Sequence, residues 1–187
     1  EAFLNLTKNG DGKIVCGINI GKNKDTKNAE DDYLLLLEKF YKKASYITIN
    51  ISSPNTKNLR DIQREDNLKK FLTSLANKKV ELRKDSGIET PILLKVAPDL
   101  SDHEIATIAN LVLENSIDGL IVSNTTISRG DDLKSDYKQQ SGGLSGAPLF
   151  EKSNVVLSKF YAILQGRVPI VAVGGVSSAD DAYQNRS

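Results

Sequence analysis

The sequence has 187 residues, of which 39% are hydrophobic and 26% are charged, and this length is sufficient for one domain with a hydrophobic core. A net charge of +1 gives no electrostatic reason to expect a nucleic-acid-binding protein, and no stretch approaches the roughly 20 apolar residues that cross a membrane. One histidine and one cysteine are too few for a conventional zinc site, so we expect no metal centre.

Short apolar runs alternate with segments of helical periodicity along the chain. The apolar runs predict strands at 13–18, 45–51, 91–96, 117–122 and 168–173. The helical spacing of apolar side chains predicts helices at 31–43, 67–83 and 152–164. A capping box formed by Ser101 and Glu104 predicts the start of a further helix. Apolar strands connected by helices indicate a parallel sheet in an α/β fold.

A doubly wound sheet and a (β/α)8 TIM barrel both fit this alternation. Polar residues or glycines come at the end of each predicted strand, at Asn19, Asn50, Lys95, Ser123 and Gly174. All strand ends converge on one face in a barrel, so this distribution favours the barrel. Five strands do not close a barrel, and both chain ends read as interrupted helices. We therefore expect residues 1–187 to be the central part of a single, incomplete barrel domain.

The stretch 50–56 is the most informative part of the chain. Asn50, Ser53 and Asn55 follow a buried strand at once, and Pro54 stiffens the loop because it fixes its own φ and restricts the residue before it. Loops at strand ends often carry the chemistry of α/β proteins. We predict that these amides and hydroxyls bind or act on a small molecule. The alternative is ordinary turn chemistry, for which Asn, Ser and Pro are common residues.

Lys95 lies between Leu94 and Val96 in an apolar strand, where an ammonium group is costly without a partner. We predict that it faces an electron-rich ligand; the alternative is that it extends past the strand end into solvent. The segment 123–126 places four consecutive polar side chains at the end of another strand. It is a second candidate ligand-binding segment, with a helix N-cap or a turn as the alternative.

Two glycine-containing segments, 142–146 and 173–175, predict a phosphate site. Glycine lets backbone N–H groups approach an anion, and the late loops of barrels often bind phosphate. A helix that starts near Ser177 would present its positive end to the same group. Asp99 reads as a turn residue in the sequence Ala-Pro-Asp.

Six motifs occur here in the order and spacing of the dihydroorotate dehydrogenases. They are GINIGKNKD (17–25), INISSPNT (49–56) with Leu59-Arg60, LKVAPDL (94–100), IDGLIVSNTT (117–126), GGLSGAP (142–148) and VGG (173–175). The chain resembles this family from Asn19 to Asp181. It is most similar to the quinone-dependent class 2, which has serine as active-site base where class 1 has cysteine.

The resemblance implies an FMN-dependent oxidoreductase that converts dihydroorotate to orotate in de novo pyrimidine (UMP) biosynthesis, with a quinone as electron acceptor. It implies that Ser53 removes the C5 proton of the substrate while hydride leaves C6. The implied substrate-binding residues are Asn50, Asn55, Asn124 and Thr125. The implied FMN-binding residues are Asn19, Asn50, Lys95, Ser123, Ser145, Gly146, Gly174 and Gly175.

The resemblance further implies a peripheral location on the bacterial or mitochondrial inner membrane. In the family, the quinone and membrane contacts come from an N-terminal helical hairpin that has no counterpart in this sequence. The first and last barrel strands of the family also lack counterparts. We expect the 187-residue chain by itself to be inactive and to bind FMN weakly or not at all.

Two other functions fit parts of the sequence. Another FMN-dependent barrel, such as a dihydrouridine synthase, would require a cysteine acid and a basic RNA-binding surface; Cys16 is misplaced for this role, and the charge is balanced. A non-catalytic phosphate-binding barrel module would keep the glycines but would not need Ser53 or Lys95.

Overall fold

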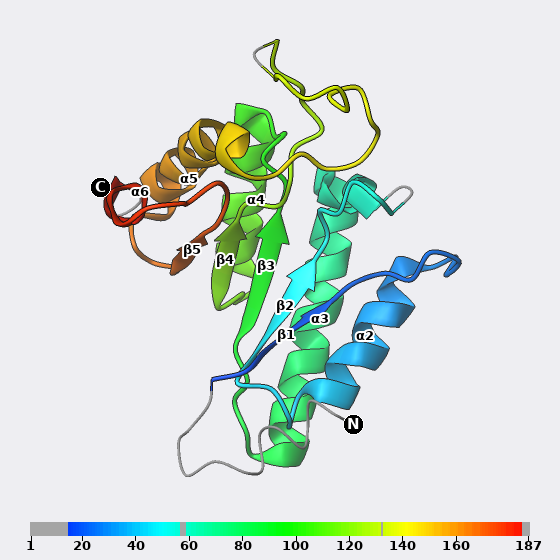
Figure 1. The fold of residues 1–187 in the computed structure, drawn as a ribbon. Coiled ribbons are helices and arrows are strands. Elements are labelled where there is room, and N and C mark those ends of the chain that lie inside the picture. The colour runs from blue at the N-terminus through cyan, green and yellow to red at the C-terminus, as the bar shows by residue number, and fades with distance from the viewer. Residues whose placement is uncertain (1–14, 57–58, 132, 185–187) are drawn as a thin grey trace.

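Consecutive parallel strands form the sheet of the computed structural model, which describes residues 15–56, 59–131 and 133–184. The strands are β1 (Gly17–Ile20), β2 (Tyr46–Asn50), β3 (Ile92–Val96), β4 (Gly119–Val122) and β5 (Ile170–Ala172) (Figure 1). Each strand pairs in parallel with the next one along the chain. A doubly wound sheet would reverse this order at a switch point, whereas a barrel requires it. The predicted fold class is therefore confirmed as an open arc of an α/β barrel.

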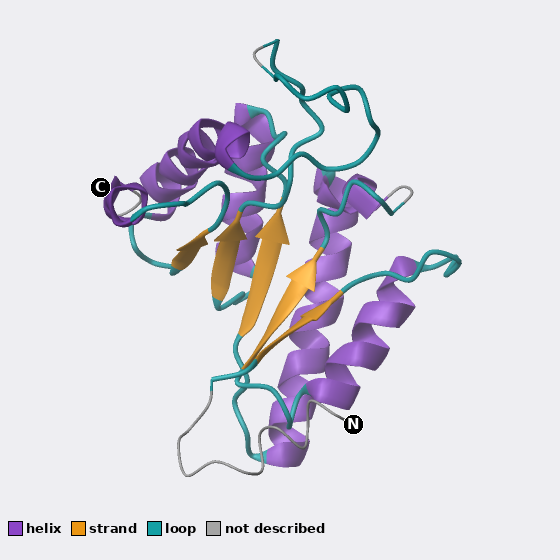
Figure 2. Ribbon diagram, in the orientation of Figure 1, coloured by secondary structure: helices purple, strands orange, loops and turns teal. Residues whose placement is uncertain are grey.

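Helices connect the strands (Figure 2), and they follow in the order of the chain (Figure 1). The helices are α2 (Ala29–Phe40), α3 (Glu65–Ser86), α4 (Asp102–Glu114), α5 (Phe150–Leu164) and the short α6 (Ala179–Gln184), with 3-10 turns η1 (Leu59–Gln63) and η2 (Ala147–Leu149). The helix α2 packs against α3, α3 against α4, and α4 against α5. In the three described stretches, no helix combines the length and the apolar character needed to cross a bilayer.

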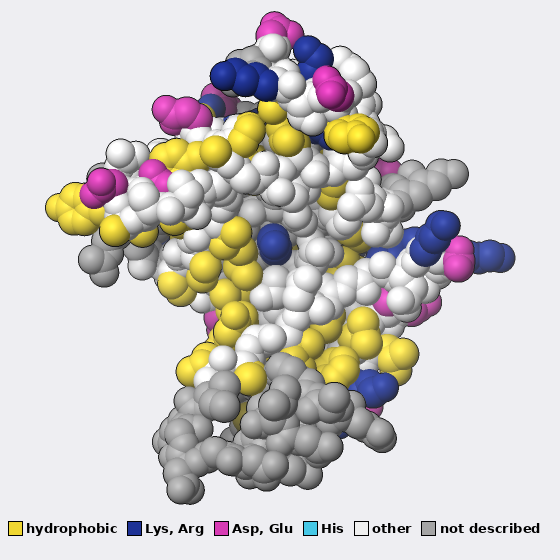
Figure 3. Space-filling model, viewed as in Figure 1, with side chains coloured by type: hydrophobic (Ala, Val, Ile, Leu, Met, Phe, Trp, Pro, Cys, Tyr) yellow, Lys and Arg dark blue, Asp and Glu magenta, His cyan; other side chains and the backbone are white. Residues whose placement is uncertain are grey.

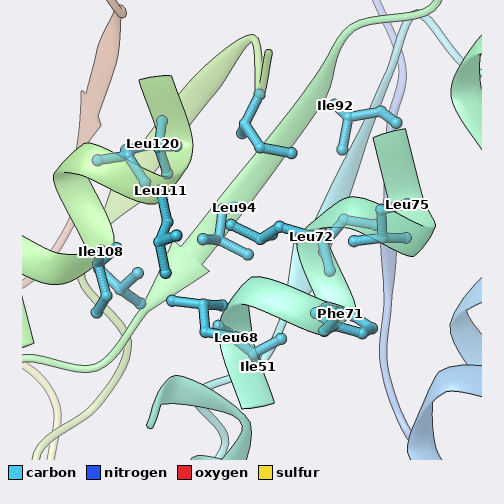
Figure 4. Close-up of a cluster of buried hydrophobic side chains, with 14 of the residues drawn as sticks. Ile51, Leu68, Phe71, Leu72, Leu75, Ile92, Leu94, Ile108, Leu111 and Leu120 are labelled. Atoms are coloured by element: carbon cyan, nitrogen blue, oxygen red, sulfur yellow. The ribbon is translucent and has the colours of Figure 1, made fainter. Parts of the chain in front are cut away.

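The hydrophobic core lies between the sheet and the helices α2, α3, α4 and α5. Alternate residues of the strands point to this side, and Ile92, Leu94 and Leu120 are at most 1% exposed. Figure 4 shows them packed with the helix side chains Leu68, Phe71, Leu72, Leu75, Ile108 and Leu111. Each buried Leu or Ile contributes about 1.5–3 kcal/mol relative to an exposed one. This core fixes the strands that carry the candidate site.

The other strand residues point to the opposite face of the sheet. Asn50, Lys95, Ile121 and Val171 lie in register across four neighbouring strands and form one row on this face. Hydrophobic side chains also gather on this face in the space-filling view (Figure 3), and Val171 is 45% exposed. The row therefore places an amide and an ammonium group side by side at the C-terminal ends of β2 and β3.

Several predicted elements end at other residues than expected. The helix α3 continues to Ser86 because Gly87 adopts a φ of +67° and ends the helix with its N–H bound to the carbonyl of Arg83. Asn19, expected after the first strand, lies within β1. The capping box of Ser101 and Glu104 at the start of α4 is confirmed. The interrupted helix expected at the N-terminal end of the chain lies outside the described residues.

Candidate active site

The loop after β2 carries Ser53 and is fixed at its buried base. Ser52 is fully buried, and its hydroxyl donates to the carbonyl of Lys95 at 2.8 Å. Ser53 is half-buried, and its Oγ accepts the backbone N–H of the exposed Asn55 at 3.3 Å. An N–H donated to an oxygen favours negative charge on that oxygen. The loop is therefore suited to place a hydroxyl that takes part in proton transfer.

Asn124, which follows β4, reaches across to the Ser53 loop. Its Nδ2 donates to Oδ1 of Asn50 at 3.1 Å and to Oγ of Ser52 at 3.0 Å. Its Oδ1 accepts the N–H of Thr125 at 2.8 Å. Both amide donors of Asn124 are thus used within the chain, while Nδ2 of Asn50 has no partner among the described residues. Asn50 is the amide that remains available to donate to a ligand.

Lys95 is half-buried and lies beside Asn50 in the register of β2 and β3. Its ammonium group makes no ion pair or hydrogen bond with any described residue. Burial lowers the pKa of Lys95, because desolvation penalises the charged form. A bound anion or electron-rich ring would compensate this cost. That Lys95 faces such a ligand stays a prediction.

A cavity of about 410 Å³ opens at the C-terminal ends of β3, β4 and β5. The predicted site residues that line it are Lys95, Ser123, Asn124, Thr125, Ser145, Gly146, Gly174 and Gly175. Leu149, Val173 and Val176 add apolar surface to the same cavity. The expected convergence of these distant segments is therefore observed, and the role of each residue stays a prediction.

Three glycines shape one wall of the cavity. Gly146, Gly174 and Gly175 have φ values of +80°, +134° and +73°, which favour glycine over other residues. A Cβ on Gly175 would lie 2.7 Å from the carbonyl oxygen of Gly146, so the wall leaves no room for a side chain. Within the described part of the chain, the N–H groups of these glycines have no acceptor. Unpaired N–H groups beside a cavity are suited to bind phosphate oxygens.

The segment 142–144 packs against both candidate substrate-binding loops. A Cβ on Gly143 would collide with Oγ1 of Thr125 and would lie 3.1 Å from Cγ of Pro54. Leu144 and Thr126 exchange two backbone hydrogen bonds, at 2.7 and 3.1 Å, which hold the segment in place. Because Gly143 has no side chain, Thr125 and Pro54 of the Ser53 loop can both pack against its backbone.

Asp99 is more than a turn residue, and the interpretation from sequence missed its role. Its Oδ1 accepts from Oγ1 of Thr126 and from Nζ of Lys152, both at 2.5 Å. Its Oδ2 accepts from Nη1 of Arg60 at 2.8 Å and from the N–H of Ile127 at 3.0 Å. Burial alone would raise the pKa of Asp99, but the hydrogen bonds from Lys152, Thr126, Ile127 and Arg60 outweigh it and hold this pKa well below its usual value.

Other predicted features lie beside the cavity or differ from expectation. Asn19, Asn50, Ser53 and Asn55 are not among its lining residues; they lie in or after β1 and β2. Oδ2 of Asp181 accepts the N–H groups of Ser177 and Ser178 at 2.8 and 3.0 Å, so two donors at the start of α6 are already used within the chain. That this helix start faces a phosphate stays a prediction.

The family model described as dihydroorotate dehydrogenase matches residues 3–186. A protein of Acinetobacter baumannii (strain AYE) named dihydroorotate dehydrogenase (quinone) is 50% identical over 170 residues, which are 90% of this chain and 51% of that protein. The Chromobacterium violaceum protein of the same name is 45% identical over 185 residues, covering 98% of this chain and 54% of that protein.

Two solved structures of proteins named DHODH are also similar to this chain in fold and sequence. A crystal structure of DHODH from Eimeria tenella in complex with ferulenol superposes with a TM-score of 0.89 at 38% identity, and the match covers 97% of this chain and 52% of that one. A ligand-free DHODH structure from the same organism superposes with a TM-score of 0.87 at 41% identity, covering 95% of this chain and 52% of that one. The chain spans about half the length of the curated relatives that it matches.

Proposed function

The chain belongs to the dihydroorotate dehydrogenase family, and on this basis we propose that the protein carrying it oxidises dihydroorotate to orotate in de novo pyrimidine biosynthesis. FMN is the proposed cofactor and a quinone the proposed electron acceptor. The observation that carries the proposal is the convergence of Lys95, Asn124 and the glycines of two late loops on one cavity. This arrangement provides a cation and free N–H groups for one ligand.

The residues present fit a flavin mononucleotide. The half-buried Lys95, which pairs with none of the residues that the structure describes, suits the electron-rich edge of the flavin ring, with Ser123 beside it. The N–H groups of Gly146, Gly174 and Gly175, which have no acceptor in the same part of the chain, suit its phosphate, with Ser145 nearby. Bound FMN supplies the acceptor for a hydride. A positive charge at Lys95 would stabilise the negative charge that accompanies hydride transfer.

The Ser53 loop provides the proposed base and part of the substrate site. The Ser53 oxygen would take the C5 proton while its own hydroxyl proton passes to a water or a neighbouring hydroxyl, and the N–H of Asn55 donated to this oxygen would stabilise the negative charge that develops on it. Asn50 would offer to the substrate its Nδ2, which has no acceptor among the described residues, while Nδ2 of Asn124 donates to Oδ1 of Asn50 and holds this side chain in place. Dihydroorotate carries a carboxylate and amide groups, which neutral amides and the hydroxyl of Thr125 can bind.

A quinone acceptor is supported by the name of the relatives in Acinetobacter and Chromobacterium. We place the protein at the periphery of an inner membrane, because a quinone is a membrane-dissolved reactant. The parts of the relatives that this chain does not span would provide the quinone and membrane contacts.

Purification of the protein as its gene encodes it tests this function. We expect a yellow protein with a stoichiometric flavin absorbance band, and dihydroorotate-dependent bleaching of a quinone-analogue dye. A yellow protein without dihydroorotate oxidation would instead indicate another FMN-dependent barrel. A colourless protein that binds inorganic phosphate would indicate a non-catalytic phosphate-binding module.

A further inference from the structure

Arg60 and Asp99 join the loops that hold the proposed site, although neither lines the cavity. We propose that they form a positioning pair that keeps Ser53 and Thr125 at a fixed separation during the reaction. This inference rests on the proposed function, because it assigns a purpose to the pair within that same site.

The guanidinium of Arg60 donates to three different loops. Its Nε donates to the carbonyl of Ser52 at 3.1 Å, and its Nη2 donates to the carbonyl of Thr125 at 2.9 Å. Its Nη1 donates to Oδ2 of Asp99 at 2.8 Å. The Ser52 carbonyl belongs to the peptide bond that leads to Ser53. One rigid group thus orients a peptide plane next to the proposed base and another at a proposed substrate-binding residue.

Asp99 keeps the guanidinium in this position. Its side chain is 12% exposed, and Arg60 at 22% exposure is largely shielded from water. Thr126 and Ile127 donate to the same carboxylate, so Asp99 also fixes the chain just after Thr125. Buried groups with several fixed partners have little freedom to move. The pair therefore couples the loops after β2, β3 and β4.

Lysine cannot replace this arginine as a positioning group. A guanidinium is planar and presents its donors in a fixed fork, whereas an ammonium is a point charge on a flexible stem. Arg60→Lys preserves the charge opposite Asp99 but cannot reach all three acceptors at once. The loop that carries Ser53 and the loop that carries Thr125 would then move relative to each other. Small displacements of reacting groups lower the reaction rate strongly.

Steady-state kinetics of Arg60→Lys test the proposal. We expect kcat to fall by about 10- to 100-fold while KM for dihydroorotate changes by less than about threefold, because orientation rather than ground-state binding is lost. Bound flavin should remain stoichiometric. The matched control is Arg64→Lys, since Arg64 is 75% exposed and pairs with Asp61 on the surface. A raised KM with unchanged kcat, or the same loss in Arg64→Lys, would overturn the proposal.

Hydrogen–deuterium exchange gives a readout that needs no substrate. In Arg60→Lys, the backbone amides of 51–56 and of 124–128 should exchange about tenfold faster than in Arg64→Lys. In a separate experiment on Arg60→Ala, millimolar guanidinium added to the assay should restore part of kcat. If the unsubstituted protein does not oxidise dihydroorotate, the proposed function fails, and exchange alone decides the positioning role. Unchanged exchange in both segments would refute that role.

Discussion

Asn124 donates a hydrogen bond to Oδ1 of Asn50 at 3.1 Å, although the two residues lie 74 positions apart in the chain. This bond connects the end of β4 to the end of β2, across the intervening strand β3. Within residues 15–56, 59–131 and 133–184, no acceptor pairs with Nδ2 of Asn50 or with the neighbouring ammonium of Lys95. Two unsatisfied donors on neighbouring strands of a half-buried surface indicate a place for an acceptor-rich ligand.

Ser53→Ala should abolish most of the turnover without removing the flavin. The substitution deletes the proposed base, and general base catalysis typically contributes about 10²- to 10⁴-fold to the rate. Dye-reduction kinetics and the flavin absorbance of the purified variant measure the two effects. Ser158→Ala is the control, because Ser158 lies on the exposed side of α5 and bonds the carbonyl of Asn154. Normal turnover in Ser53→Ala would remove Ser53 from the mechanism.

Lys95→Met should stabilise the flavin-free protein and weaken flavin binding. Methionine removes a half-buried charge that has no partner among the described residues, so the free energy of unfolding should rise by about 1 kcal/mol. Denaturant unfolding of the apoprotein and the flavin-to-protein ratio measure the two opposite changes. Lys70→Met, at an exposed position of α3, should leave both quantities near their original values. An apoprotein destabilised by Lys95→Met would contradict this account of Lys95.

The architecture was largely predictable from sequence because it depends on local patterns. Apolar periodicity located the strands and helices, and the capping box of Ser101 and Glu104 marks the start of α4 as expected. Polar residues at the strand ends favoured the barrel, but a doubly wound sheet also gathers its strand ends at one edge, so the consecutive strand order of the structure is what distinguishes the two folds.

The role of Asp99 could not be predicted in the same way. Its partners Arg60, Thr126 and Lys152 lie 39, 27 and 53 residues away, so no local pattern reveals them. The available signal was weak: Arg60 and Asp99 both occur in the motifs shared with the family. Likewise, the family resemblance implies a substrate-binding role for Asn124, but no local pattern indicates that its Nδ2 donates to Asn50 and Ser52.

Gly143→Ala should impair the site through a steric clash. The added Cβ would collide with Oγ1 of Thr125, so either Thr125 or the 142–144 segment must move. We expect kcat/KM to fall by at least about tenfold, because a displaced loop misorients the substrate. Gly21→Ala is the control, since its Cβ would meet the carbonyl oxygen of Asn50 at an ordinary 3.7 Å. Equal activity of both variants would show that the 142–144 segment yields without affecting the site.

The contribution of Asp99 to stability should depend on pH in a defined direction. Hydrogen bonds from Lys152, Thr126, Ile127 and Arg60 hold the pKa of Asp99 in the folded protein below its unfolded value of about 3.9, despite the opposing effect of burial. The unfolded state therefore binds more protons in the acidic range, and stability from this group is present above about pH 4 and is lost as the pH falls below it. Asp99→Asn removes this contribution, so the stability difference from the unsubstituted protein should be largest near neutral pH and should shrink on acidification.

Urea unfolding between pH 7 and pH 3 measures this difference. Removing one partner of a largely buried ion pair costs about 3–5 kcal/mol, which sets the upper limit expected for Asp99→Asn at neutral pH. Asp102→Asn is the matched control, because Asp102 is 80% exposed and pairs with Lys159 on the surface. Its loss should stay below about 1 kcal/mol. A difference for Asp99→Asn that grows as the pH falls would mean that the carboxylate is not held ionised by Arg60 and Lys152.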